Sequence, residues 1–381
     1  MTFWMKAPPP RPPAAITAAC ALLALLGGCS GGGETAPAGA MASPRHGHTA
    51  TMLPGGRVLL AAGLTKTSPL GSIEVFDPRK NAFEALAGAQ VRPRGWHRAT
   101  LLKDGRVLLS GGWAGPAIAL REAVAIRPGG AGASAFLMLQ GRYDHTATLL
   151  EDGTVLLAGG NDGRSEQRAL EIFDPRAGKT LPAARPLLVA RQQHTATLLP
   201  GGGVLILGGA QGDGARIAEL YHPAERRTHA VRGYASAARS RHTATRLKDG
   251  RVLIAGGLGP ERTLAAAELF DPKEGVFLPI QAPMRTPRQQ HTAVLLPDGR
   301  VVLLGGWGGG EGKTLDDGEV FDPEGACFAP LPVHLRAKRR LHTATLLEGG
   351  AILIAGGASD DEVLATAEIL RVPPRKPDGG C

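Results

Sequence analysis

The sequence predicts an all-β protein, a seven-bladed β-propeller built from four-stranded antiparallel blades. Three observations lead to this prediction: a motif repeated seven times, a hairpin pattern inside each repeat, and an incomplete last repeat. Of the 381 residues, 54 are glycine and 30 are proline, while 43% are apolar. That apolar share is too high for a disordered chain, so the glycines and prolines indicate many turns between short strands.

The repeated motif is Arg-x-x-His. Successive histidines lie 49, 48, 49, 48, 49 and 51 residues apart, a regularity that composition alone does not produce. Repeats of this length that can each form four strands are typical of propeller blades. The seven pairs are Arg45 and His48, Arg94 and His97, Arg142 and His145, Arg191 and His194, Arg239 and His242, Arg288 and His291, and Arg339 and His342.

The fifth repeat shows the pattern of one blade. An alternating run from His242 is followed by Asp249-Gly250 and by the apolar run Val252–Ala255. Asp-Gly between two apolar runs predicts a hairpin with a two-residue turn, in which both residues have positive φ. Paired glycines, Gly256-Gly257, end the second strand and allow a sharp turn or close packing. Pro272 ends the third strand because proline lacks the amide that a continuing strand needs.

The two ends of the chain complement one another. The seventh repeat stops after its third strand, and residues 33–45 resemble the fourth-strand segment 276–288, with Met41 matching Met284. We therefore expect the N-terminal segment to complete the last blade and leave the ring without a free sheet edge. The expected organisation is a signal peptide over residues 1–28, a tether over 29–32, the propeller over 33–372 and a disordered tail over 373–381.

The first thirty residues resemble the leader of a bacterial lipoprotein. Lys6 and Arg11 precede an apolar stretch, residues 14–28, that is too short to span a bilayer. Leu26-Gly27-Gly28-Cys29 resembles a lipobox, in which the cysteine receives diacylglycerol before cleavage. The resemblance implies export and a lipid anchor at Cys29 in the cell envelope, and Ser30 favours the outer membrane. An ordinary signal peptide cut elsewhere is the alternative.

Charge and cysteine content give weaker expectations. The net charge of +9 falls to +7, with 41 basic and 34 acidic residues, once Lys6 and Arg11 are removed. Over a large surface this excess permits weak attraction to anionic glycans or lipids and gives no reason to expect nucleic acid. With four cysteines, disulfides do not carry the fold, and pairing of Cys327 with Cys381 stays open. We expect a monomer.

The complete pattern, R-x-x-H-T-A-T-L-L-x-D-G-x-V-L-L-x-G-G followed by A-E-x-F-D-P, resembles the kelch family, especially the kelch domain of galactose-oxidase-like proteins. The resemblance covers residues 33–372, although its aromatic positions are mostly Phe and its second repeat is degenerate. A galactose-oxidase-like copper site would need two tyrosines, two histidines and a Tyr–Cys crosslink. The only tyrosines are Tyr143, Tyr221 and Tyr234, none near a cysteine in sequence. We therefore expect no cofactor and no catalytic residues.

Two periodic sets of polar residues have a structural interpretation. A glutamate follows each repeat arginine by 28 to 31 residues, and opposite charges at a fixed phase predict one ion pair per blade, within a blade or across a joint. The alternative is an electropositive rim that binds an anionic ligand. The repeat histidines are held apart around a ring, so we expect no metal site. The glutamates are Glu74, Glu122, Glu171, Glu219, Glu268, Glu319 and Glu368.

Candidate binding residues lie in the variable loops after the glycine pairs: Trp113, Trp307, Asp162 and Asp213. Loops on a rigid scaffold often carry binding residues, and an exposed tryptophan can stack on a sugar or anchor a protein contact. It can equally cover the blade below. We expect a non-enzymatic envelope or surface protein whose propeller face binds a protein or glycan partner. The alternative is a periplasmic sugar-active enzyme, oxidase- or epimerase-like, that uses the central funnel.

Overall fold

A computed structural model describes residues 33–375 except 130–131, 210–211 and 310–311, and for residues 212–213 it describes the backbone alone. The chain divides into a unit of residues 1–31 and a unit of residues 32–381. The expected signal peptide, the anchor Cys29, the tether and residues 376–381 of the expected tail lie outside the described residues. Among the residues that are described, no helix is both long and apolar enough to cross a bilayer.

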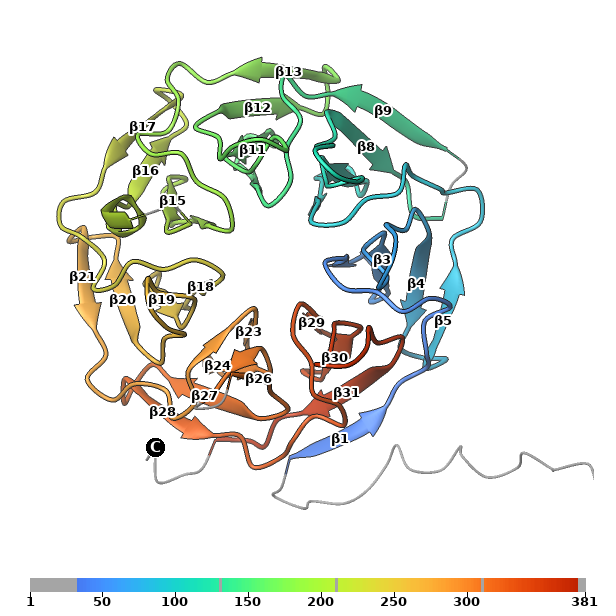
Figure 1. The fold of residues 1–381 in the computed structure, drawn as a ribbon, viewed down its shortest axis with the longest axis vertical. Helices are drawn as coiled ribbons and strands as arrows, with labels where there is room; N and C mark the ends of the chain where they lie inside the picture. The colour runs from blue at the N-terminus through green and yellow to red at the C-terminus, as the bar shows by residue number, and fades with distance from the viewer. Residues whose placement is uncertain (1–32, 130–131, 210–211, 310–311, 376–381) are drawn as a thin grey trace, which may run out of the picture. The chain divides into compact units, whose positions relative to one another are not determined.

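Within the described part of residues 32–381, seven four-stranded antiparallel sheets stand around a ring (Figure 1). We number them as blades 1 to 7 in chain order. Blades 1 to 4 contain β2(Thr49–Met52), β3(Val58–Ala61), β4(Ile73–Asp77) and β5(Ala82–Ala85); β6(Arg98–Leu101), β7(Val107–Ser110), β8(Glu122–Ile126) and β9(Ala133–Leu137); β10(Thr146–Leu149), β11(Val155–Ala158), β12(Leu170–Asp174) and β13(Lys179–Pro182); and β14(Thr195–Leu198), β15(Val204–Leu207), β16(Glu219–His222) and β17(Arg227–Ala230).

Blades 5 to 7 repeat this pattern. They contain β18(Thr243–Arg246), β19(Val252–Ala255), β20(Ala267–Asp271) and β21(Val276–Pro279); β23(Thr292–Leu295), β24(Val301–Leu304), β27(Gly318–Asp322) and β28(Cys327–Pro330); and β29(Thr343–Leu346), β30(Ile352–Ala355), β31(Ala367–Arg371) and β1(Glu34–Pro37). A small sheet of β22(Arg288–Gln289), β25(Trp307–Gly308) and β26(Lys313–Thr314) extends the loops of blade 6, and a 3-10 helix, η1(Gly212–Arg216), lies in blade 4. The predicted all-β propeller is confirmed.

The N-terminal segment closes the ring, as the sequence predicts. Strand β1 pairs antiparallel with β31, with Glu34 opposite Arg371 and Pro37 opposite Glu368. Figure 1 shows β1, in blue, beside β31, in red, in blade 7. The innermost strands β2 and β29 also pack together, so blades 1 and 7 meet like any other neighbouring pair. Cys327 in β28 is disulfide-bonded, and its partner lies outside the described residues.

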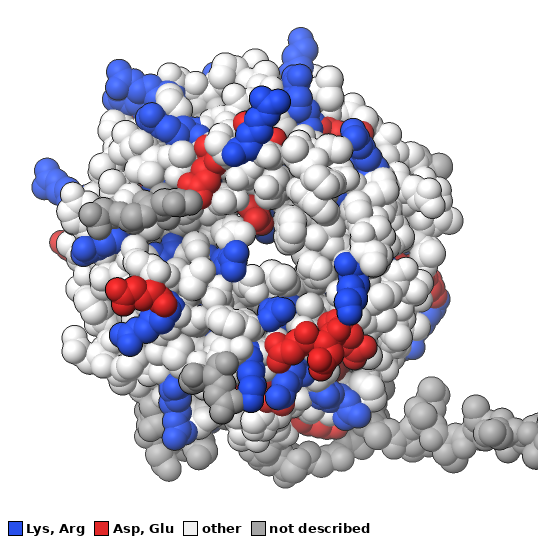
Figure 2. Space-filling model, in the orientation of Figure 1, with Lys and Arg blue, Asp and Glu red and all other residues white. Residues whose placement is uncertain are grey.

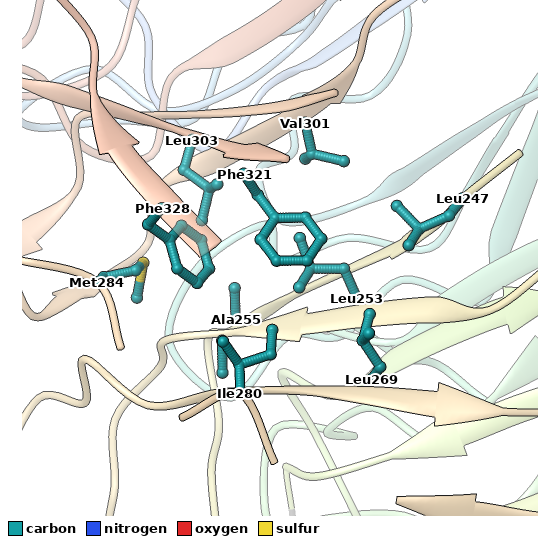
Figure 3. Packing of buried hydrophobic residues seen from close by; sticks show 11 residues of the cluster. Leu247, Leu253, Ala255, Leu269, Ile280, Met284, Val301, Leu303, Phe321 and Phe328 are labelled. Atoms are coloured by element: carbon teal, nitrogen blue, oxygen red, sulfur yellow. The ribbon is translucent and has the colours of Figure 1, made fainter. Parts of the chain in front are cut away.

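The hydrophobic core lies between blades. Side chains alternate along a strand, so in β3 Leu59 faces blade 2 and Leu60 faces blade 7. The second strand of each blade is therefore buried on both faces, which explains its unbroken apolar sequence. Figure 3 shows the cluster in which Leu269 of blade 5 meets Val301 and Phe321 of blade 6. Seven such clusters occur in the described residues, one at each joint.

The predicted hairpins form with a different turn. At Asp104-Gly105, Asp152-Gly153 and Asp298-Gly299 the glycine alone has positive φ, so the prediction of positive φ at both residues is wrong there. The amide of Leu102 donates to the carbonyl of Arg106 at 2.8 Å, which makes the connection longer than two residues. Asp104 Oδ1 accepts the amide of Arg106 at 3.0 Å. Because the aspartate side chain supplies this bond, only the glycine must adopt the left-handed conformation.

The second residue of each Gly-Gly pair joins one blade to the next. Its amide donates to the carbonyl of the repeat arginine in the following blade, for example from Gly112 to Arg142 at 2.8 Å. A Cβ on the first glycine, Gly111, would lie 2.2 Å from the same carbonyl oxygen. The close approach at this joint therefore needs glycine.

The repeat arginines form ion pairs inside their own blades. In blade 4, Arg191 donates to Glu219 Oε1 at 2.9 Å and to the carbonyl of Gly208 at 2.7 Å, and neither charged side chain is exposed. Glu219 also accepts the amide of Leu188 and the hydroxyl of Thr228. The structure therefore shows that each arginine pairs with a glutamate within its blade and not across a joint between blades. The pairs are Arg45–Glu74, Arg94–Glu122, Arg142–Glu171, Arg191–Glu219, Arg239–Glu268, Arg288–Glu319 and Arg339–Glu368.

Candidate functional site in the central funnel

The residue before each repeat histidine has a left-handed backbone. Its φ lies between 51° and 57° in all seven repeats, and six of the seven residues are not glycine. Each amide donates to the carbonyl of its counterpart in the preceding blade, at 2.9 to 3.3 Å, so the bonds form a closed ring. Non-glycine residues held in this conformation cluster at functional sites. The seven are Gly47, Trp96, Asp144, Gln193, Arg241, Gln290 and Leu341.

These residues line a cavity of about 530 Å³ on the axis of the ring, which we call the funnel. Every repeat contributes to its wall, and six of the seven repeat histidines, all but His145, line it together with Arg98, Tyr143, Gln192 and Thr195. Figure 2 shows the central hollow with basic and acidic side chains at its edge. The seven positions divide the wall into two arcs. Leu341, Gly47 and Trp96 are consecutive around the ring and form an apolar arc, while Asp144 through Gln290 form a polar one.

The repeat histidines are structural links between blades. In six joints, the Nε2 atom lies 2.9 to 3.1 Å from the hydroxyl of the threonine that follows the histidine of the preceding repeat, as for His97 and Thr49. Burial lowers the pKa of these histidines, to about 3 for His48 and His242, so they are neutral near pH 7. Among the described residues, no three or more His, Cys, Asp or Glu side chains are placed to hold a metal ion.

Blade 2 departs from this rule. Arg98 occupies the threonine position, and its neighbour across the β6–β7 pair is Ser110, where other blades have Ala or Leu. The Ser110 hydroxyl lies 2.9 Å from His145 Nε2 and replaces the missing threonine. The hydroxyl contact to His145 between blades 2 and 3 therefore does not depend on residue 98. Its Nε donates to the carbonyl of His145 at 2.5 Å, and the guanidinium lines the funnel beside Asp144.

Asp144 is the acidic residue of the funnel wall. Gln193 donates to its Oδ2 at 2.9 Å, and Arg241 Nε donates to Gln193 Oε1 at 2.8 Å, which fixes the orientation of the amide. Burial raises the pKa of Asp144, while the charges of Arg98 and Arg241 and the bond from Gln193 oppose the rise. A carboxyl group with a raised pKa, flanked by arginines in a cavity, is suited to accepting and returning a proton.

Trp96 and Tyr143 line the wall next to Asp144, and Trp113 packs against Trp96. The ring of Trp96 lies 5.5 Å from that of Trp113 and 6.1 Å from that of Tyr143, between centroids. A Cβ on Gly47 would lie 2.8 Å from the indole of Trp96, so glycine at this position lets the indole lie across the apolar arc. Half-buried aromatic rings beside polar groups suit a ligand that has both an apolar face and polar groups, as a sugar has.

The four predicted binding residues lie in different surroundings. Trp113 supports Trp96 behind the funnel wall. Trp307 lies in β25, close to Gly312, where an added Cβ would be 2.9 Å from its ring. Asp162 Oδ1 accepts the amides of Arg164 and Ser165 at 2.8 Å and shapes a turn. Asp213 belongs to η1, and its side chain lies outside the described part.

Sequence reasoning missed Arg98, Asp144, Gln193 and Arg241. The signal was present in blade 2, where H-R-A-T and V-L-L-S replace the usual H-T-A-T and V-L-L-A. Comparing the repeats position by position would have found it. The remaining three residues occupy the position directly before the repeat histidine, where the residue type varies between repeats.

Comparison with known proteins supports the fold. No family model matches the sequence, and no curated protein matches it. Among solved structures, a fungal alcohol oxidase of the AA5 family, in complex with copper, superimposes with a TM-score of 0.76 and 18% sequence identity, over 91% of this chain and 78% of that chain. The chain therefore shares the β-propeller fold of this oxidase.

This comparison corrects the expectation of a non-enzymatic binding protein. That expectation rested on the lack of a recognisable catalytic motif, whereas the similar structure is an oxidase and the folded chain gathers ionisable groups in the funnel. The described residues do not fit a copper set of two tyrosines and two histidines, because a single tyrosine lines the funnel. Tyr143 alone among the tyrosines lines the funnel, and Tyr234 is exposed.

Proposed function

We propose that the protein is a sugar-active enzyme that carries out proton transfer in the funnel, closer to an epimerase or isomerase than to a copper oxidase. The observation that carries this proposal is the exchange in blade 2. Arg98 has left the ring of threonine–histidine links while Ser110 keeps His145 bonded, so this blade supplies a cation beside Asp144 without loss of the joint. A structural role alone would favour the threonine present in the other six repeats.

The chemistry follows from the groups in the funnel wall. Asp144 accepts a proton from a substrate carbon that lies next to a carbonyl group, and the electron pair of that C–H bond moves onto the carbonyl oxygen. It returns the proton either to the neighbouring carbon or, after the planar intermediate has turned over, to the other face of the same carbon. The transfer uses Oδ1, since Oδ2 accepts the bond from Gln193. Arg98 stabilises the negative charge that develops on a substrate oxygen during this transfer. Trp96 and Leu341 offer an apolar surface to the C–H face of a sugar ring.

Turnover tests the proposal directly. Purified protein is incubated with a panel of neutral and acidic monosaccharides in D2O, and NMR follows solvent-deuterium incorporation and the appearance of a new stereoisomer. We expect Asp144→Asn to lower the rate by about 100-fold or more. Asp361→Asn, which changes an exposed aspartate, is the matched control and keeps full activity. An unchanged panel, or an equal rate for Asp144→Asn, would exclude proton transfer at Asp144.

We also propose that the enzyme works outside the cytoplasm, attached to the cell envelope through a lipid on Cys29. The support is the lipobox-like Leu-Gly-Gly-Cys sequence at residues 26–29. The exported location is compatible with a fold that does not depend on reduced cysteines.

A further inference from the structure

We infer that the substrate of the funnel is an anionic sugar, carrying one carboxylate or phosphate group that binds between Arg98 and Arg241. The inference rests on the proposed function, since it assumes that the funnel binds a substrate. It adds the charge of that substrate and the residues that bind its anionic group.

The charge of the funnel wall is not balanced. Its charged residues, among those described, are Arg98, Arg241 and Asp144. The histidines in the wall are neutral because burial lowers their pKa. Two positive charges and one negative charge leave a single excess positive charge on the wall of the funnel. One anionic group on a ligand would neutralise it, and the attraction is stronger there than at an exposed surface.

The two arginines also have free donors. Arg98 uses its Nε for the carbonyl of His145, and neither of its Nη atoms has a hydrogen-bond partner among the described residues. Arg241 donates from Nε to Gln193 and from Nη1 to Gln289 at 3.4 Å, which holds the guanidinium in place and leaves Nη2 without a partner in the described part. The repeat arginines differ, because each is paired with a glutamate of its own blade. Arginine donors fixed in position suit an oxyanion.

The position of these donors matches the proposed chemistry. Arg98, Asp144, Gln193 and Arg241 come from blades 2, 3, 4 and 5, so the two cations flank the carboxyl group along the polar arc. An anion bound by Arg241 places the rest of a sugar over Asp144, with its less polar face toward the neighbouring Trp96 at the end of the apolar arc. A neutral sugar would leave the excess charge and the Nη atoms without a partner.

Binding of matched sugars tests the inference. Isothermal titration calorimetry compares D-galacturonate and D-galactose 6-phosphate with D-galactose, at low and at physiological salt. We expect at least one of the two anions to bind at least tenfold more tightly than galactose, with a preference that weakens as salt increases. The two anionic arms distinguish a carboxylate from a phosphate substrate.

Two variants assign the preference to the arginines. Arg241→Gln and Arg98→Thr should each reduce anion binding about tenfold and so reduce the preference for the anions over galactose. Arg98→Thr introduces the residue of the other six blades, so it should fold with the melting temperature of the parent. Arg262→Gln removes an exposed arginine and should retain the full preference.

Equal affinity for all three sugars, no binding of any of them, or a preference unaffected by both variants would overturn the inference. These results are separate from those on the proposed function. Turnover of neutral sugars without a preference for anions would leave the enzyme proposal standing and remove this one. Selective anion binding without turnover would support an anion site in the funnel and remove the enzyme proposal.

Discussion

Replacing Arg191 with alanine should destabilise the propeller strongly, with no ligand present. The guanidinium is fully buried and donates to Glu219 and to the carbonyl of Gly208, so its loss leaves a buried carboxylate and a carbonyl without their partner. Removing one member of a buried ion pair costs about 3–5 kcal/mol. For a unit of roughly 340 residues, the unfolding entropy is about 0.7 kcal/mol/K, so the melting temperature should fall by about 4–7 °C.

Differential scanning calorimetry of four variants measures this effect and its cause. Arg185→Ala removes an exposed arginine from the segment before blade 4 and should melt within about 1 °C of the parent. The double variant Arg191→Ala with Glu219→Ala should be less destabilised than the sum of the two single variants, because no unpaired charge remains. If Arg191→Ala melts like Arg185→Ala, the ring of arginine–glutamate pairs does not stabilise the blades and our structural account of it is wrong.

Three further predictions concern the closure, the histidines and the anchor. Deleting residues 33–38 removes β1, exposes the edge of β31 and should lower the melting temperature and promote aggregation; a deletion variant with parental melting and solubility would contradict the closure mechanism. The repeat histidines have lower pKa values in the folded state than in the unfolded state, where they are near 6.5, so the unfolded chain takes up protons first as the pH falls. The free energy of unfolding should therefore decrease from pH 6.5 toward pH 3, by about 1.4 kcal/mol per pH unit for each histidine. Urea titrations at pH 7, 6 and 5 should show unfolding midpoints that fall with the pH. Cys29→Ala should move the protein from the membrane fraction to a soluble or unprocessed form, and an intact mass with an unmodified Cys29 in the parent would rule out the anchor.

The sequence by itself determined the repeat, the hairpins and the closure. These features depend on contacts that recur with the same spacing in each copy, so seven copies of Arg-x-x-His and of the glycine pair reveal them. Even the missing strand was visible, because residues 33–45 resemble a segment of the fifth repeat. The ion pairs were also visible as a fixed phase, although only the folded blade shows that Arg191 meets Glu219 in its own sheet.

The tertiary structure decided the functional site. Arg98, Asp144, Gln193 and Arg241 are separated by 46 to 49 residues from one to the next. Arg98 replaces the threonine of the other six repeats, and the other three occupy a position whose residue type varies between repeats. No local pattern links them. They meet because the ring brings equivalent positions of successive blades to one axis, where side chains that differ between blades face a shared cavity. The repeat encodes the scaffold in every copy, whereas the chemistry depends on the differences between copies, and only ring closure brings those differences together.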